Sequence, residues 1–223
     1  MSSARCGWRD GDRYTDATDI ENEMAMMKLA KEHDIPCPDV RDDLSKMDFN
    51  PDSSSTDKYH MIVMTQMRMD DVLPEDVLTL AKSLVNACIK LHNDAGILHC
   101  DIKPNNLAWD KKTSVVSLLD FGHAQPEDGA RSYGGTKGYE APEVVRKENG
   151  QRQPHTRASD AYSVGKTLLK VVNGFRVDEN DNTYSTEVNM VREVGDLLCE
   201  DDACVRLTLE GAESKLLRWP ECS

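Results

Sequence analysis

The feature that most constrains this chain is a short apolar run between two polar stretches. Residues 115–119 read VVSLL, which has the length and composition of a buried strand. The stretch before it, residues 99–106, reads HCDIKPNN, and the stretch after it, residues 120–122, reads DFG. A chain that folds around this run places two aspartates, a lysine and two asparagines at the edges of one small strand unit.

The residue types in these two stretches fit phosphoryl transfer. Asp101, on a loop, can accept a proton from an attacking hydroxyl group. Lys103 can neutralise charge on a transferring phosphoryl group. Asn106 and Asp120 offer the oxygen ligands that Mg²⁺ prefers. An oriented hydroxyl, a metal ion on the phosphates and charge stabilisation are what this reaction requires.

Hydrophobic periodicity predicts a small mixed part followed by a mainly helical part, and therefore an α+β protein. The first predicted helix has Thr18 as its N-cap, because Thr18 and Glu21 have the spacing of a capping box. Further predicted elements are a strand over 60–67, a helix that opens at 74–76 and stops at Gly96, a nearly all-apolar helix over 157–172, and a last helix around 188–198.

Charge and cysteine content restrict the partners and the compartment. The net charge of −13 over 223 residues argues against binding to nucleic acid or to an anionic membrane. No stretch approaches the roughly 18 apolar residues of a membrane span, and residues 1–6 lack the apolar core of a signal peptide. The seven cysteines form no C-x-x-C pair, so reduced thiols are expected. These features predict a cytoplasmic protein, with the nucleus as the alternative.

Five segments, in order, resemble the motifs of eukaryotic protein kinases. Residues 99–106 resemble the catalytic loop H-R-D-x-K-P-x-N, and residues 120–122 resemble the metal-binding DFG motif. Residues 135–143, GTKGYEAPE, are similar to the G-T-x-x-Y-x-A-P-E segment that closes the activation loop. Asp160 resembles the aspartate that opens the central helix, and Arg206 resembles the late arginine that pairs with the A-P-E glutamate. Each motif is weak by itself, but five in family order are specific.

The resemblance, which runs from about residue 20 to 217, implies a protein-kinase-like bilobal fold. One domain would cover residues 1–223, with a shortened small lobe over 1–69 and a mainly helical large lobe over 70–223. The implied activity is that of a serine/threonine protein kinase, because Lys103 and Thr136 form the serine/threonine version of their motifs. Such an enzyme uses ATP and Mg²⁺ and acts on a hydroxyl group of a protein substrate.

The resemblance also implies a role for each matching residue. Asp101 would be the catalytic base and Lys103 would contact the γ-phosphate of ATP. Asn106 and Asp120 would hold Mg²⁺ and, through it, the nucleotide.

Further contacts with ATP would come from the small lobe. Glu23 would be the glutamate of the family's helix C, although a solvated helix face is an equal reading of this residue. Met64 would be the gatekeeper, and residues 65–67, including Gln66, would form the hinge that meets adenine. A hydrophobic spine would be formed by Met27, His99 and Phe121.

Two departures from the family pattern keep other functions open. Cys100 replaces the arginine that reads a phosphate on the activation loop, which disfavours activation by loop phosphorylation. The sequence has no G-x-G-x-x-G, and its first lysine, Lys28, follows Glu23, so it holds no strand lysine for ATP. Arg5 lies about where that lysine would fall, but arginine is a poor substitute.

Two alternatives to an active protein kinase follow. A true loss of the Gly-rich loop and lysine predicts a pseudokinase that acts as a binding or scaffold protein, whereas a truncated gene model predicts an active kinase. A small-molecule kinase is the other alternative. The intact segment of residues 141–143 and Thr136 argue against it, because they shape a peptide groove in the family.

Overall fold

The computed structural model describes residues 17–43, 62–64, 67, 70–129, 134–145, 147–148, 151–175 and 185–218. Among these residues, no helix combines the length and apolar character that crossing a membrane would need.

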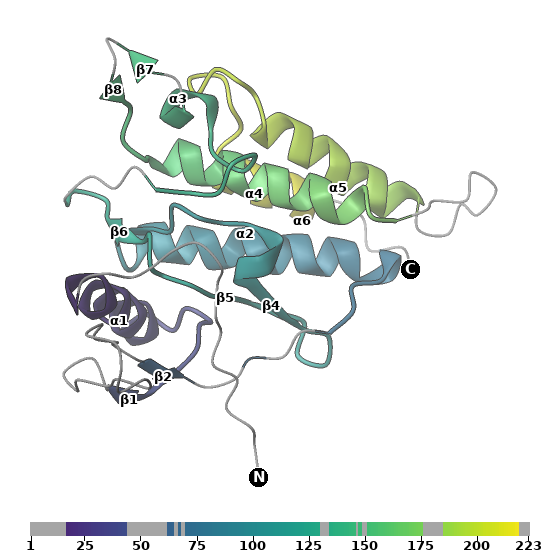
Figure 1. Cartoon of the computed structure of the whole chain (residues 1–223). Coiled ribbons are helices and arrows are strands. Elements are labelled where there is room, and N and C mark those ends of the chain that lie inside the picture. The colour runs from purple at the N-terminus through teal and green to yellow at the C-terminus, as the bar shows by residue number, and fades with distance from the viewer. Residues whose placement is uncertain are drawn as a thin grey trace, which may run out of the picture.

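Helices dominate after residue 70, and every strand is short (Figure 1). The elements are α1 (Ala17–Glu32), β1 (Val40–Asp43), β2 (Ile62–Met64), the 3₁₀ turn η1 (Pro74–Asp76), α2 (Val77–Asn93), β3 (Ile97–Leu98), the 3₁₀ turn η2 (Pro104–Asn106), β4 (Leu107–Asp110), β5 (Val115–Leu118), β6 (Gln125–Pro126), α3 (Pro142–Val145), β7 (Lys147–Glu148), β8 (Gln151–Arg152), α4 (Arg157–Val172), α5 (Ser185–Leu198) and α6 (Leu209–Leu217).

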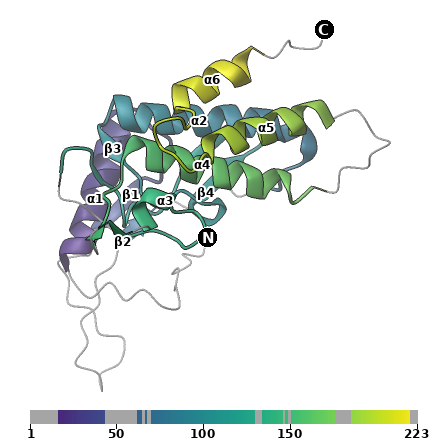
Figure 2. The ribbon, with the colours of Figure 1, turned by 90° about the horizontal axis from the view of Figure 1, so that it is seen from above.

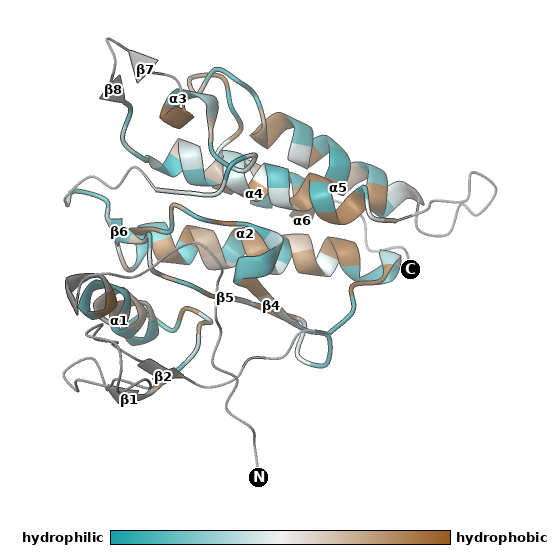
Figure 3. Cartoon of the chain, viewed as in Figure 1, coloured by the Kyte–Doolittle hydropathy of each residue, from teal (hydrophilic) through white to brown (hydrophobic). Residues whose placement is uncertain are grey.

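Helix α2 lies at the centre of the large helical part. It contacts α4, α5 and α6 as well as strands β3 and β5, so it is covered on several sides (Figures 1 and 2). The residues predicted to share its apolar face are all buried, which confirms the helical spacing read from the sequence. They are Val77, Leu80, Ala81, Leu84, Cys88 and Leu91. Hydropathy mapped on the ribbon shows the same alternation of apolar and polar residues along α2, α4 and α5 (Figure 3).

The small N-terminal part consists of α1 and the antiparallel pair β1–β2, in which Val40 lies opposite Met64. The predicted inner face of α1 is buried, at Ile20, Met24, Met27 and Ala30. The predicted N-cap is wrong, because α1 already includes Ala17 and therefore contains Thr18 in its first turn. The predicted strand over 60–67 is confirmed at 62–64 only, since Met67 is not in a strand and the remaining positions lie outside the described residues.

Two antiparallel strand pairs bring the polar stretches together. β4 pairs with β5, with Leu107 opposite Leu118, and β3 pairs with β6, with Leu98 opposite Gln125. The stretch 99–106 joins β3 to β4, and the stretch 120–122 lies between β5 and β6. Because the strands on both sides of one stretch pair with the strands on both sides of the other, the two stretches are held next to each other.

Helices α4 and α5 pack at unusually short range through two glycines. A methyl group on Gly165 would lie 2.7 Å from Cβ of Leu198 and 2.8 Å from the carbonyl oxygen of Gly195. These are contacts that packed atoms do not tolerate, and one of them is to backbone that cannot rotate away. The spacing of α4 and α5 therefore depends on the missing side chain at Gly165.

We expect Gly165→Ala to destabilise the fold. Alanine favours a helix by about 1 kcal/mol over glycine, but overpacking commonly costs about 1–3 kcal/mol, and the backbone contact puts this site at the costly end. The free energy of unfolding in urea should fall. The control is Gly211→Ala in α6, whose only contact under 3 Å is the rotatable end of Leu207, at 2.7 Å. A Gly165→Ala protein as stable as the Gly211→Ala protein would contradict this account.

Candidate active site

The buried carboxylate of Asp160, in the first turn of α4, fixes the path of residues 99 and 100. Its Oδ2 accepts a hydrogen bond from the backbone N–H of His99 at 2.8 Å, and its Oδ1 accepts one from Cys100 at 3.0 Å. The His92 ring nitrogen Nε2 lies 2.9 Å from the same Oδ2. Asp160 is fully buried, so these three donors replace the water that a carboxylate would otherwise bind. Asp160 therefore anchors the loop to the start of α4.

The pKa of Asp160 is lowered by these donors. Burial alone would raise it, but the contact with His92, the nearby His99 ring and the bond from the His99 amide together outweigh burial. Asp160 is therefore ionised at neutral pH. His92 was not among the residues selected from the sequence, and only its proximity to Asp160 in the fold gives it this role.

Asp101, Lys103 and Asn106 form one connected cluster, as the motif match predicts. Nζ of Lys103 lies 2.6 Å from Oδ2 of Asp101, and Nδ2 of Asn106 donates to the same oxygen at 2.8 Å. Asn106 also donates to the backbone carbonyl of Asp101 at 2.9 Å, which closes the loop on itself. All three side chains are at most 8% exposed. The cluster is thus rigid and mostly shielded from water.

The two oxygens of Asp101 have different environments. Oδ2 receives Lys103 and Asn106, whereas Oδ1 is buried with no hydrogen-bond partner among the described residues. Burial raises the pKa of Asp101, but Lys103 and the hydroxyl of Thr136 outweigh burial and hold the pKa below its usual value. Asp101 is therefore a carboxylate with one oxygen left to accept a proton or a hydrogen bond.

The DFG stretch is attached to this cluster through the backbone. The N–H of Leu119 donates to the carbonyl of Asn106 at 2.8 Å, so Asp120 follows directly on the residue that bonds Asn106. Asp120 is half-buried and has φ +61°, in the left-handed region, and Cys100 has φ +65°. Left-handed geometry costs a non-glycine residue about 1 kcal/mol or more. Backbone strain is thus present on both stretches beside the cluster.

The rings of His99 and Phe121 pack against each other at a tilt of 49°, with ring centroids 5.1 Å apart. Burial lowers the pKa of His99, so the ring is neutral. Its Nε2 lies 3.1 Å from the carbonyl of Leu119, which can only accept, so Nε2 carries the proton. Met27 and Phe121 belong to the same buried core. The contact between the two rings confirms the His99–Phe121 part of the predicted spine.

Residues 134–145 cover the cluster. Nζ of Lys103 donates to the hydroxyl of Thr136, and the hydroxyl of Ser163, on α4, donates to the carbonyl of Tyr139 at 2.8 Å. At the end of this segment Glu143 forms a two-bond ion pair with Arg206, at 2.6 and 2.9 Å. The predicted pairing of Arg206 with the A-P-E glutamate is therefore confirmed.

The remaining predicted site residues have different outcomes. Glu23 is 8% exposed, so the reading of a solvated helix face is wrong. Met64, predicted as the gatekeeper, is 41% exposed in this structure. Gln66, predicted in the hinge, lies outside the described residues, as does Arg5. Contacts of Glu23, Met64 and Gln66 with nucleotide remain predictions.

One further cluster has the composition of a metal site. A ligand atom from each of Cys100, His155 and Asp160 lies within 4.8 Å of the others, and all three residues are buried. Metal binding requires a thiolate, but burial and the nearby carboxylates of Asp160 and Asp101 raise the pKa of Cys100 strongly. Both oxygens of Asp160 already accept backbone hydrogen bonds. The carboxylate of Asp160 therefore holds the loop rather than a metal ion.

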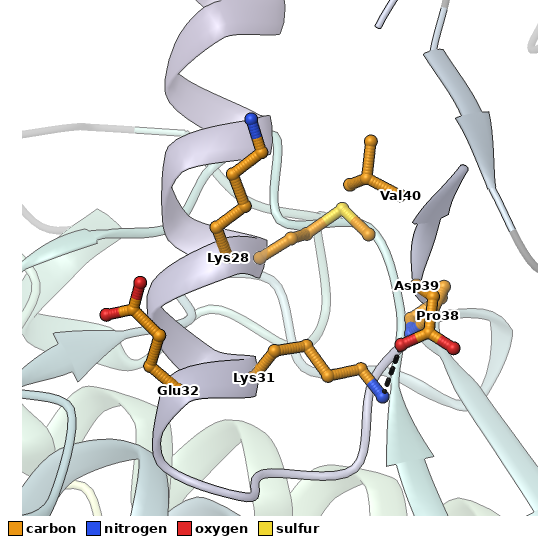
Figure 4. A pocket seen from close by; sticks show the side chains of 7 residues that line it. Lys28, Lys31, Glu32, Pro38, Asp39 and Val40 are labelled. Carbon is orange, nitrogen blue, oxygen red and sulfur yellow. Dashed lines mark ion pairs between the residues drawn. The ribbon is translucent and has the colours of Figure 1, made fainter. Parts of the chain in front are cut away.

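A separate pocket of about 300 Å³ lies between α1 and the start of β1 (Figure 4). Lys31 reaches across one end of it to Asp39, at 3.0 Å (Figure 4). None of the four predicted catalytic and metal residues lines this pocket. It is therefore distinct from the cluster around Asp101.

Comparison with known proteins agrees with this geometry. The model of the protein kinase domain matches residues 10–212. The chain is a protein kinase domain. Its α+β fold, with a strand-poor small lobe and a helical large lobe, is the one that the motifs predict.

Curated relatives of this kinase domain are larger proteins. It is 30% identical to the probable L-type lectin-domain containing receptor kinase VI.1 of Arabidopsis thaliana over 165 residues, 70% of the chain and 23% of the relative. It is 35% identical to the serine/threonine-protein kinase TIO of the same plant over 129 residues, 56% of the chain and 9% of the relative. It is 32% identical to the calcium/calmodulin-dependent protein kinase type 1 of Caenorhabditis briggsae over 120 residues, 51% of the chain and 32% of the relative. The matches thus span between 9% and 32% of the length of these relatives.

Replacing Asp160 should weaken the kinase domain in a pH-dependent way. The folded-state pKa of Asp160 lies below its unfolded value, so its stabilisation is full above about pH 4 and is lost as pH falls through the lowered pKa. Asp160→Asn should lose roughly 2–4 kcal/mol of unfolding free energy at pH 7 and less near pH 3. Urea titrations at both pH values measure this. Asp196→Asn, at an exposed position of α5, is the control and should change stability by less than about 0.5 kcal/mol.

Proposed function

We propose that this kinase domain transfers the γ-phosphate of ATP to a serine or threonine hydroxyl of a protein substrate, with Mg²⁺. The observation that carries the proposal is the environment of Asp101. One carboxylate oxygen is held by Lys103 and Asn106, and the other is buried without a partner among the described residues. A decayed site has no physical need to retain a buried ionised aspartate with a vacant acceptor.

Asp101 is suited to receive the hydroxyl group of the substrate. Its lowered pKa keeps it ionised, and Oδ1 can accept the hydroxyl proton as the oxygen attacks phosphorus. The hydrogen bonds to Oδ2 fix the plane of the carboxylate, so the direction of Oδ1 is set before substrate binds.

Lys103 is suited to stabilise the transferred group. An ammonium group has three N–H donors, and the described contacts of Lys103 use two of them, to Asp101 and to Thr136. The third can bind a phosphoryl oxygen, where its positive charge offsets the charge that builds up in the transition state. The hydroxyl of Thr136 links Lys103 to residues 134–145, the covering segment. A threonine at this position together with this lysine is the serine/threonine form of the family motifs, so we expect a serine or threonine substrate.

Asn106 and Asp120 fit a magnesium ion by their chemistry and placement. One offers an amide oxygen and the other a carboxylate, both hard ligands, from two stretches joined by the Leu119–Asn106 backbone bond. Magnesium bound with ATP would supply charge neutralisation and orientation of the phosphates. The protein's part is to present these two side chains beside Asp101.

The pseudokinase alternative rests on a specific sequence observation. The sequence has no G-x-G-x-x-G and no lysine before Glu23, the residue that would pair with it. Without these groups, nucleotide would be held mainly by the large lobe and by Mg²⁺. This alternative predicts a folded protein that binds a partner without transferring phosphate.

Thermal unfolding with Mg²⁺-ATP tests nucleotide binding. At 100 times the dissociation constant, the melting temperature should rise by about 5–10 °C. Asp120→Asn should lose most of this rise because it removes a charged metal ligand. The control Asp71→Asn, at an exposed aspartate outside the site, should retain it. An equal rise in both variants would contradict the assignment of Asp120.

Phosphotransfer to a serine- and threonine-containing acceptor protein tests the chemistry. Asp101→Asn should reduce the rate by roughly 10²–10⁴-fold, since it removes the proton acceptor, while the Mg²⁺-ATP melting shift stays. Radiolabelled ATP and acid hydrolysis of the product identify the acceptor residue. A wild-type protein that binds Mg²⁺-ATP and transfers nothing would favour the pseudokinase. Label on a small molecule alone would favour a small-molecule kinase.

A further inference from the structure

His155 lies just before helix α4 and contacts both the first turn of that helix and the segment that covers the catalytic loop. Its Nε2 is 2.7 Å from the carbonyl oxygen of Gly134, and its Nδ1 is 3.3 Å from the hydroxyl of Ser159. The ring is 6% exposed. A carbonyl oxygen only accepts, so Nε2–H is the donor in this bond, whether or not the ring carries a charge.

The position of His155 is fixed by the start of α4. Thr156 is the N-cap, and its side chain accepts a hydrogen bond from the N–H of Ser159 at 3.2 Å. In return, the Ser159 hydroxyl receives the N–H of Thr156 at 2.9 Å. This capping box sets the backbone at the helix start. The same Ser159 hydroxyl contacts the ring, so His155 projects from a rigid platform.

Gly134 begins the described part of the segment that covers the catalytic loop. A methyl group on Gly134 would overlap the ring of His123, next to the DFG stretch. A methyl group on Gly135 would lie 3.3 Å from the carbonyl oxygen of Cys100. Thr136 then contacts Lys103. Residues 134–136 therefore lie directly against the catalytic loop and the DFG stretch. The hydrogen bond from His155 holds this segment at Gly134.

The side chain at position 100 points toward His155. Cys100 Sγ, a ring nitrogen of His155 and a carboxylate oxygen of Asp160 lie within 4.8 Å of one another. The small side chain of Cys100 thus leaves the room that the ring occupies. His155 is a neighbour of the Asp160 anchor as well as of the covering segment.

We propose that His155 is a positioning residue that latches residues 134–136 onto the catalytic loop, so that Thr136 is held against Lys103. The latch is a hydrogen bond from a ring to a backbone carbonyl and needs no added phosphate. The effect of the latch on catalysis rests on the proposed function. The effect of the latch on the structure of residues 134–136 does not.

A pair of amide variants tests the latch. The side-chain nitrogen of His155→Gln can reach the position of Nε2 and should keep the donor to Gly134. His155→Asn places its nitrogen near the position of Nδ1 and should lose it. Hydrogen–deuterium exchange, without nucleotide, should become about fivefold faster over residues 134–141 in the Asn variant and stay within about twofold of wild type in the Gln variant. Peptides from α2 and α5 should be unchanged in both and show that the fold is intact.

Two exchange results would overturn the latch. One is equal protection of residues 134–141 in wild type and the Asn variant. The other is an equal loss in both variants, because a ring-specific packing role, rather than the donor, would then explain it.

The catalytic consequence is read separately. Where wild type transfers phosphate, His155→Asn should lower kcat about tenfold with little change in the KM for ATP, and His155→Gln should restore most of it. An unchanged kcat in the Asn variant overturns the positioning role. A wild type that transfers no phosphate counts against the proposed function, while the exchange comparison still decides the latch.

Discussion

The carboxylate of Asp160 accepts hydrogen bonds from the backbone of His99 and Cys100, and the path of the catalytic loop follows from those two bonds. A fully buried charge is tolerated only when donors replace its lost water, and here two amides and His92 do so. Because each donor lies at least 60 residues away along the chain, the anchor also ties α4 to α2 and to the loop. Asp101, Lys103 and Asn106 are then arranged by contacts within a few residues.

Helix α4 serves as a platform as well as a core helix. Its Thr167 hydroxyl contacts the carbonyl of Ile102 at 3.4 Å, its Ser163 hydroxyl binds the carbonyl of Tyr139, and His155 at its start binds Gly134. The helix can do this because its buried polar side chains bind backbone groups: Ser163 and Thr167 donate to carbonyls, and Asp160 accepts from amides. The catalytic loop and the covering segment are thus both attached to α4. This common attachment gives the site a defined geometry before any ligand binds.

The sequence predicted more of the large lobe than of the small one. The apolar spacing of α2 and the bounds of α4 are confirmed, because those helices are buried on the faces that the periodicity marks. β1, β4 and α6 were not predicted, since a strand such as Leu107–Asp110 is too short to show alternation. The predicted cap at Thr18 is wrong because the helix continues to Ala17. His155 and His92 were missed, since nothing local distinguishes a lone histidine that binds a distant residue.

The sequence by itself determined the family and the order of its motifs, and it predicts which groups react, because these depend on residue type and spacing along the chain. Only the tertiary structure decided that Glu23 is buried, that one oxygen of Asp101 is engaged while the other is not, and that His92 lies against Asp160. The physical reason is the same in each case. Burial, pKa and hydrogen-bond partners are set by groups that are far apart in sequence, such as His92 and Asp160, which are 68 residues apart, and folding alone brings them within bonding distance.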